Sequence, residues 1–268
     1  MAPFLPLPIK SLTPYHRHWC IEGRALEKTS IHEYKTDNSD GKVFGFEFID
    51  KESSEIHVTC FNEVVDEFYN VIQPGCLYKI SGGHIKVSNI KYSSSPNPYE
   101  IHLVRTSTVS PSTCLDSTIP NHSFHFRSID SLDTFPINSL VDVIGILVSF
   151  TPASTIRKRN NISTKKCTAT IKDMSDHTIE VTLWGHHCEA EGEKIFELFL
   201  QPTPTIILIK SALLVSWNGK KLDTTFSTFL KINPNLPECY ALQIWYASVG
   251  NDRPSIPLSK GPNTPFRI

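Results

Sequence analysis

Four aromatic residues stand where an exposed ring could stack on a flat partner. Phe61 and Trp184 each end a segment that alternates apolar and polar residues, and each falls on its polar face. Tyr92 and Trp217 lie further along the chain, among Ser, Asn and Lys residues. Exposed rings of this kind suit stacking on nucleic-acid bases, worth about 1–3 kcal/mol per base. For any single ring, cover by a following helix or loop is the simpler interpretation.

Basic side chains near these aromatic residues are suited to contact the phosphates of a nucleic acid. The densest group is Arg157, Lys158 and Arg159, in a polar loop of the second half. A solvated turn and a short nuclear-import sequence are alternative interpretations of this run. Thr182 shares a strand face with Trp184 and is a further candidate contact. The other candidate cations are Lys35, Lys42, Lys86, Lys91, Lys165, Lys166 and Lys220.

Metal and catalytic chemistry are weakly indicated. The run His186, His187, Cys188 and the pair His122 and His125 have no matching second pair at zinc-ligand spacing, which favours surface histidines. The sequence contains no glycine-rich phosphate loop, no HExxH motif and no GxSxG motif. We therefore expect a protein that is not an enzyme and that uses neither a metal nor a cofactor.

A short phrase occurs twice and indicates an internal duplication. Residues 56–62 read IHVTCFN, and residues 179–185, at an offset of 123, read IEVTLWG. The same offset carries Asp50 onto Asp173. Alternation with period two is typical of a half-buried strand, and the Ser/Asp-rich residues after each aspartate are typical of a hairpin turn. We therefore expect two copies of one small β domain.

Length and composition agree with this division. A chain of 268 residues allows two domains of about 120 residues, each able to bury a core without disulfides or metal. The net charge is −1, unlike the basic balance typical of nucleic-acid-binding proteins. Seven cysteines without a CxxC pair indicate reduced thiols. The sequence has neither a long apolar run nor the features of a signal peptide, which favours a cytosolic or nuclear protein.

The predicted elements follow the same order in both copies. The first copy is expected to contain strands at 19–27, 42–50 and 56–61, a helix at 64–72, and strands at 76–81, 84–92 and about 100–105. The second is expected to contain strands at 140–150, 166–173 and 177–184, a helix at 189–199, strands at 205–217 and 221–225, and a helix at 236–247. A polar loop over 34–41 is expected to reverse the chain, and Gly23 nearly matches Gly145 in the first strand of each copy.

Five strands with a helix after the third is the order of the OB-fold. This fold is a partly open barrel whose second and third strands form a groove for oligonucleotides. The sequence therefore predicts an all-β protein with short helices, built from two tandem OB-fold five-stranded barrels. Each barrel would present two aromatic rings, placed to stack on consecutive bases.

Five segments, in order along the chain, closely resemble the large subunit of replication protein A, the eukaryotic single-stranded DNA binder. They are residues 8–15 (PIKSLTPY), 41–44 (GKVF), 60–63 (CFNE), 139–145 (SLVDVIG) and 182–185 (TLWG). The similarity covers about residues 8–250, which match the two central DNA-binding OB domains of that family. It implies stacking positions at Phe61, Tyr92, Trp184 and Trp217, the four rings chosen above. It also implies phosphate contacts at Lys86, Lys158 and Lys166.

The first domain departs from the family pattern. Where the family often has arginine, this chain has His32 and His57, which are largely neutral near pH 7. The first loop also carries Asp37 and Asp40. We therefore expect the first domain to bind DNA more weakly than the second, with His32 and His57 retained as candidate contacts.

The resemblance also predicts the domain organisation. The expected parts are an N-terminal lead 1–15, a first OB-fold DNA-binding domain 16–108, a linker 109–122, a second such domain 123–235, a C-terminal helix 236–250 and a flexible tail 251–268. The family's N-terminal interaction domain and zinc-bearing third domain have no counterpart here, and the tail does not resemble family sequence. We therefore expect a truncated chain or a divergent paralogue.

These observations predict non-catalytic binding of single-stranded DNA in the nucleus, with little sequence preference, in DNA replication, repair or recombination. Other replication protein A subunits or repair proteins are further expected partners, and a membrane is not. One alternative is a protein-interaction adaptor of the same family that has lost strong DNA binding, favoured by the near-zero net charge. A weaker alternative is a barrel that belongs to the nucleic-acid arm of an enzyme.

Overall fold

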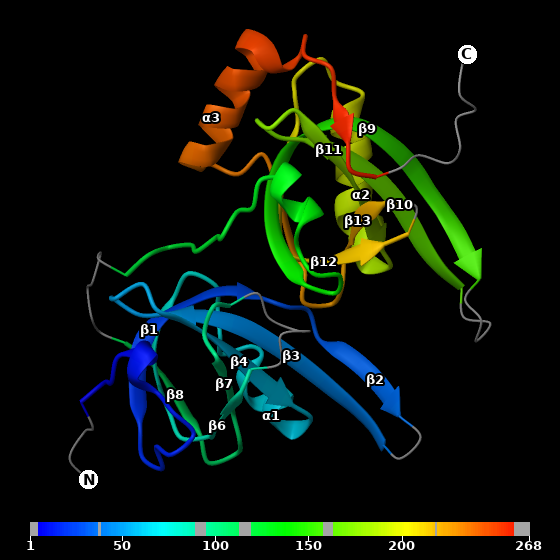
Figure 1. The fold of residues 1–268 in the computed structure, drawn as a ribbon. Helices are drawn as coiled ribbons and strands as arrows, with labels where there is room; N and C mark the ends of the chain where they lie inside the picture. Colours follow the sequence, from blue (N-terminus) through cyan, green and yellow to red (C-terminus); the bar gives the residue numbers. More distant parts are fainter. Residues whose placement is uncertain are drawn as a thin grey trace. The chain divides into compact units, whose positions relative to one another are not determined.

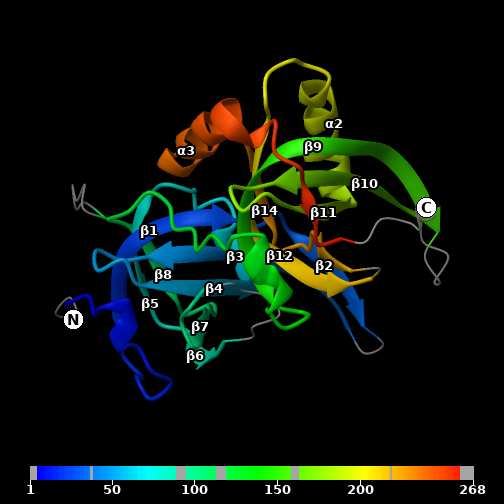
Figure 2. The ribbon, with the colours of Figure 1, turned by 45° about the horizontal axis from the view of Figure 1, so that its top comes forward.

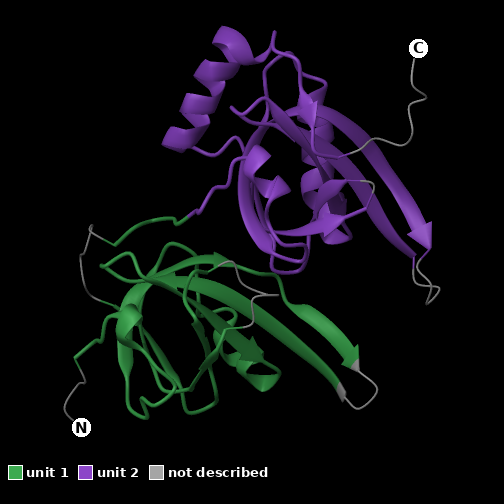
Figure 3. Ribbon diagram, viewed as in Figure 1, with its two compact units in different colours: residues 1–123 green, residues 124–268 purple. Residues whose placement is uncertain are grey.

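The chain folds as two barrels. The computed structural model describes residues 5–36, 39–88, 95–112, 119–157, 163–217 and 219–259. Two compact units comprise residues 1–123 and 124–268 (Figure 3). The predicted all-β class is confirmed, because each unit is a sheet curled into a barrel-like shape with short helices (Figures 1 and 2). Among the described residues no helix has the length and apolar character needed to cross a membrane.

The first unit follows the predicted order of strands with a helix after the third core strand. Its elements are η1 (Ile9–Ser11), β1 (Cys20–Lys28), β2 (His32–Thr36), β3 (Ser39–Ile49), β4 (Glu55–Phe61), α1 (Glu63–Phe68), β5 (Leu77–Ser81), β6 (His84–Val87), β7 (Tyr99–His102) and β8 (Thr108–Pro111). Strand β3 pairs with β1 and β4, and β1 also pairs with β5. Strand β4 also pairs in parallel with β7, and β7 pairs with β6, so the sheet runs β6-β7-β4-β3-β1-β5-β8.

The second unit closes into a ring. Its elements are η2 (Asp130–Asp133), β9 (Leu140–Arg157), β10 (Ser163–Lys172), β11 (His177–Trp184), α2 (His186–Phe199), β12 (Ile206–Ser216), β13 (Lys220–Asp223), β14 (Phe229–Ile232), α3 (Pro237–Trp245), the π-helix η3 (Tyr246–Gly250) and β15 (Ile256–Pro257). Strands β9, β10, β11, β13 and β12 each pair with the next, and β12 returns to β9. Helix α3 packs on β9 and β12 through a small apolar cluster of its own.

The duplicated aspartate has the same structural role in both units. The carboxylate of Asp50 accepts the backbone N–H of Ile9 at 2.7 Å, and that of Asp173 accepts the N–H of Ile129 at 2.7 Å. In each case the other carboxylate oxygen accepts N–H groups of the hairpin turn that follows. One buried side chain therefore ties the 3-10 helix to the central hairpin, with its charge satisfied by hydrogen bonds.

The matched glycines allow two strands to approach closely. A Cβ atom at Gly23 would overlap the carbonyl oxygen of Ile49, and a Cβ atom at Gly145 would lie 3.1 Å from the carbonyl oxygen of Lys172. Ile49 and Lys172 are separated by the repeat offset of 123 residues. In both units, therefore, the first strand passes close to the backbone of the central hairpin at a glycine.

Two segments predicted to be connections belong to the first barrel. In the lead 1–15, Ile9 and Leu12 are buried in the core. In the predicted linker 109–122, β8 pairs with β5, and Ile119 packs against the first unit. The Pro- and Ser/Thr-rich composition of these segments did not predict the contacts. An edge strand such as β8 pairs through its backbone and requires few apolar side chains.

Residues 256–257 of the predicted tail form β15, which pairs in parallel with β11. Part of the polar loop 34–41 is strand, since β2 and β3 pair as a hairpin up to Thr36 and Ser39. Helix α2 begins at His186, three residues earlier than expected, and β14 was not predicted.

Candidate nucleic-acid interface

Trp184 is held from two sides at the end of β11. It lies opposite Lys166 of β10, whose Nζ is 5.8 Å from the centroid of the indole ring. Its backbone N–H donates to Thr224 Oγ1 at 2.9 Å. The ring is half-buried and has a cation beside one face.

Asp223, which pairs with Thr182 across β11 and β13, was not predicted. Burial raises the pKa of its carboxyl, while hydrogen bonds from Trp184 and Thr182 and the charges of Lys166 and Lys221 oppose that rise. Thr182 is only 9% exposed and offers little surface to DNA. It is therefore corrected from a predicted contact to a largely covered residue.

Trp217 is the most exposed of the described aromatic candidates, at 76%. It follows β12, in the turn before β13. The register of β11 with β13 places this turn level with the start of β11, and Trp184 lies at its end. At about 3.3 Å per residue the two Cα atoms are separated by roughly 16 Å or more. The two rings lie at different levels along β11 and β13, and their contact with consecutive bases stays a prediction.

Cations of the second unit differ in availability. Arg157 is exposed near the tip of the long β9–β10 hairpin, which extends beyond the barrel (Figures 1 and 2). Lys165 forms an exposed ion pair with Glu189 at 3.3 Å. Lys220 is excluded as a phosphate contact, because its Nζ donates to three backbone carbonyls in and after η2.

Phe61 ends β4 at the position that matches Trp184. The ring is 36% exposed, and its centroid lies 5.3 Å from that of His102, at an interplanar angle of 54°. Lys86 is exposed on β6, and His32 is exposed on β2. The remaining predicted residues Asp37, Lys91, Tyr92, Lys158 and Arg159 lie outside the described residues.

The other first-unit cations are paired with acids. Lys35 lies 3.5 Å from Asp40, and Lys42 forms an ion pair with Asp66. These four residues, together with Glu33, Tyr34, Gly41, Asn62 and Glu63, line a shallow cavity of about 520 Å³ beside the β2–β3 hairpin. The acids there outnumber the cations, so this surface is poorly suited to attract phosphate.

His57 is corrected from a candidate contact to a buried residue. Its ring is 7% exposed, and Nδ1 lies 2.8 Å from Glu47 Oε1. A Cβ atom at Gly45 would lie 2.7 Å from His57 Nε2, so the missing side chain of Gly45 makes room for the ring. The alternating pattern predicts that His57 lies on the polar face of β4. It does not show that this face is buried at His57.

Comparison with known proteins agrees with this arrangement. Residues 129–233 match the family model of the replication protein A OB domain. One of the replication protein A 70 kDa DNA-binding subunits of Arabidopsis thaliana is 37% identical over 97% of this chain and 33% of its own length. The 70 kDa DNA-binding subunit of Danio rerio is 35% identical over 96% of this chain and 41% of its own length.

The chain is similar to the replication protein A large subunit. A solved structure of a replication protein A heterotrimer bound to ssDNA aligns with a TM-score of 0.69 and 28% identity, covering 96% of this chain and 58% of that one. The chain spans between 33% and 41% of the length of the two curated relatives above.

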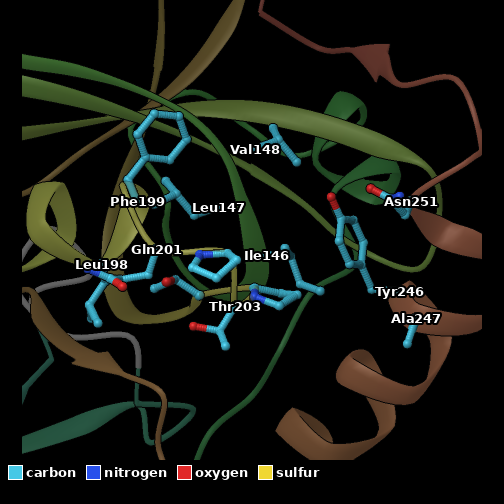
Figure 4. Close-up of a pocket in the computed structure, with 13 residues that line it drawn as sticks. Ile146, Leu147, Val148, Leu198, Phe199, Gln201, Thr203, Tyr246, Ala247 and Asn251 are labelled. Carbon is cyan, nitrogen blue, oxygen red and sulfur yellow. The ribbon is translucent and has the colours of Figure 1, made fainter.

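A separate cavity of the second unit lies away from Trp184. It has a volume of about 430 Å³, and Figure 4 shows Tyr246 and Asn251 on one side with Leu198 and Phe199 on the other. Its lining residue Ile146 pairs with Lys172, at the opposite end of β10 from Lys166. The cavity is therefore not part of the surface that carries Trp184.

Proposed function

We propose that the chain binds single-stranded DNA without catalysis and with little sequence preference. The observation that carries the proposal is Trp184, a half-buried ring at the end of β11 with Lys166 Nζ 5.8 Å from its centroid. The ring offers a flat face for a base, and the neighbouring cation can contact a phosphate. Stacking is available to every base, so the expected sequence preference is slight.

The second unit is proposed to contribute most of the affinity. Trp184 and Trp217 supply the rings, and Lys166 and Arg157 lie on the β9–β10 hairpin to contact phosphates. Lys158 and Arg159 join this set through the resemblance. In the first unit Phe61, Lys86 and Tyr92 are the proposed contacts, with His32, Lys35 and Lys42 peripheral to them.

The relatives support a wider role for the same chemistry. The curated relatives are named DNA-binding subunits, and the solved relative is a heterotrimer bound to ssDNA. We propose that this chain acts in the nucleus, in DNA replication, repair or recombination. Other replication protein A subunits are proposed as protein partners.

Fluorescence anisotropy with a labelled thymidine 30-mer tests the proposal. The wild-type chain should bind with an affinity that falls as salt rises, because phosphate contacts release counterions. The double variant Trp184→Ala, Trp217→Ala should lose most of this affinity. Tyr240→Ala removes a ring that is 54% exposed on α3 and should bind like the wild type.

A protein-interaction adaptor is the alternative, favoured by the acid-paired cations of the first unit. In that case binding to the 30-mer would be weak at low salt, and the two tryptophan substitutions would leave it unchanged. That outcome would contradict the DNA-binding proposal.

A further inference from the structure

A compact group of ligating side chains occupies the start of α2, just after Trp184. One donor atom from each of His186, His187 and Glu191 lies within 4.8 Å of the other two. Sequence spacing favoured ordinary surface histidines, because it did not reveal that the first turns of α2 bring Glu191 to both rings. We propose that these three side chains bind a divalent transition-metal ion of the Zn²⁺ class.

The hydrogen bonds of His187 carry the proposal. Its Nε2 lies 3.3 Å from the carbonyl oxygen of Thr225, and a carbonyl oxygen can only accept, so Nε2 bears the proton. In the neutral ring the lone pair of Nδ1 then faces Glu191 Oε2, 3.2 Å away. Two acceptors in this position need a proton or a cation between them. Metal-bound histidines commonly donate their second N–H to a backbone carbonyl in this way.

The distances suit a small metal ion. Zinc bonds histidine nitrogen and carboxylate oxygen at about 2.0–2.2 Å, so its ligand atoms lie about 3.4 Å apart in a tetrahedron. The Nδ1 atom of His187 and the carboxylate of Glu191 already have nearly this separation. The third ligand, His186, is exposed and can rotate to complete the set.

A metal ion bound here would lie at the start of α2, where the helix dipole opposes a positive charge and the ligands can offset that effect. The carboxylate of Glu191 compensates the charge, and ligand bonds to metal are far stronger than the effect of the dipole. Two imidazoles favour zinc, nickel or cobalt over magnesium or calcium, which prefer oxygen ligands. A fourth position remains for water or another ligand.

The competing explanation is a plain ion pair between protonated His187 and Glu191, which are four residues apart on α2. A metal titration separates the two. The full chain is titrated with Zn²⁺ against a chromophoric chelator, and Co²⁺ is added in parallel to record its visible spectrum. The variants are His186→Ala and Glu191→Gln, and Glu193→Gln removes an exposed carboxylate of the same helix as the control.

We expect one Zn²⁺ per chain, and an affinity reduced about tenfold or more in His186→Ala and in Glu191→Gln, a loss of about 1.4 kcal/mol or more. Glu193→Gln should match the wild type, and bound Co²⁺ should show d–d bands without a thiolate charge-transfer band. Unfolding curves in chelator, without metal, verify that each variant is folded. Equal Zn²⁺ affinity in all chains, no binding, or a thiolate band would overturn the proposal.

Discussion

At the scale of single residues, the side chains around an aromatic ring matter as much as the ring. Trp184 lies opposite Lys166, and Thr182 of the same strand pairs with Asp223. A strand-end aromatic thus stands among charged side chains. Because burial is the main cause that raises the pKa of Asp223, this carboxyl also makes stability depend on pH.

We expect Asp223→Asn to make the free energy of unfolding less dependent on pH. The folded pKa lies above the value of about 3.9 typical of an unfolded chain. Between the two values the folded protein holds more protons, so the free energy of unfolding falls as pH rises through this window. Urea unfolding at a series of pH values from about 4 upward should show a smaller fall in Asp223→Asn than in the wild type. The exposed Asp252→Asn should follow the wild type, and equal slopes in all three would refute the idea.

The ion pair of Lys42 with Asp66 gives a second prediction. Asp66→Asn releases Lys42 from its partner, so affinity for a thymidine 30-mer should increase. If Lys42 then contacts one phosphate, the salt dependence should steepen by about 0.7. Anisotropy titrations at several salt concentrations measure both effects. Glu67→Gln, which removes a neighbouring exposed carboxylate, is the control for a change in net charge alone; an equal gain there would assign the effect to long-range electrostatics.

The strand face on which a residue lies could be predicted where the sequence alternates between apolar and polar residues. Phe61 and Trp184 were found because each interrupts a polar face at the same register. His57 followed the same pattern, yet it is buried against Glu47. Asp223 carried no local signal, because its role depends on the parallel pairing of β11 with β13, about forty residues apart in sequence.

At the scale of elements, the duplication is a repeated backbone geometry. Ser53 and Asp176 share positive φ angles of 58° and 62°, and Asn62 and Gly185 share angles of 51° and 53°. Both pairs are separated by the repeat offset of 123 residues. The hairpin turn and the entry to the helix therefore have the same shape in both units, although only one of these four residues is glycine.

The glycine crossing can be tested in both barrels. Gly23→Ala and Gly145→Ala should each lower the free energy of unfolding by about 1–3 kcal/mol, because the added methyl group overpacks a strand crossing. The loss should be larger for Gly23, whose Cβ would meet backbone rather than mainly a side chain. Chemical unfolding measures both, with the exposed Ser154→Ala of β9 as control. Losses no larger than that of the control would contradict the shared geometry.

Because β15 pairs with β11, we expect the segment after α3 to stabilise the second unit. Ser259 is 5% exposed, and its Oγ accepts the N–H of Glu180 at 3.0 Å and donates to the carbonyl of Lys220 at 2.8 Å. Ser259→Ala leaves both groups without this partner, which should cost about 1–3 kcal/mol. Ser255→Ala, exposed in the same segment, should change the unfolding midpoint little. Similar midpoints for the two variants would show that the segment adds no stability.

Long strands could be predicted from the sequence, and short edge strands could not. The alternation in β3 and β11 buries Phe44, Phe46 and Phe48 in one core and Ile179 and Val181 in the other. Strands β8, β14 and β15 are two to four residues long and pair at the margins of the sheets. Their pairing depends on backbone groups of distant strands, so their own side chains predict little.

At the scale of the whole molecule, the net charge of −1 does not show that the two units differ in how their cations are paired. The first unit neutralises Lys35 and Lys42 with acids, and the second carries Arg157 on an exposed hairpin. Under the proposed function, the second unit captures the strand, and the first binds it at the high effective concentration that a tether provides. A weak first site then contributes to affinity only when the strand reaches both barrels.

This coupling predicts a dependence on strand length. One OB fold covers about 4–16 nucleotides, so a thymidine 8-mer should occupy the second unit alone, whereas a 30-mer reaches both. Phe61→Ala should therefore leave affinity for the 8-mer unchanged and weaken binding to the 30-mer by the loss of one stacked base, about 1–3 kcal/mol. Trp184→Ala should weaken binding to both strands. Anisotropy titrations of the three proteins against the two strands measure this pattern. An equal loss for Phe61→Ala on both lengths would show that the first unit makes the initial contact, and the proposed order of the two sites would be wrong.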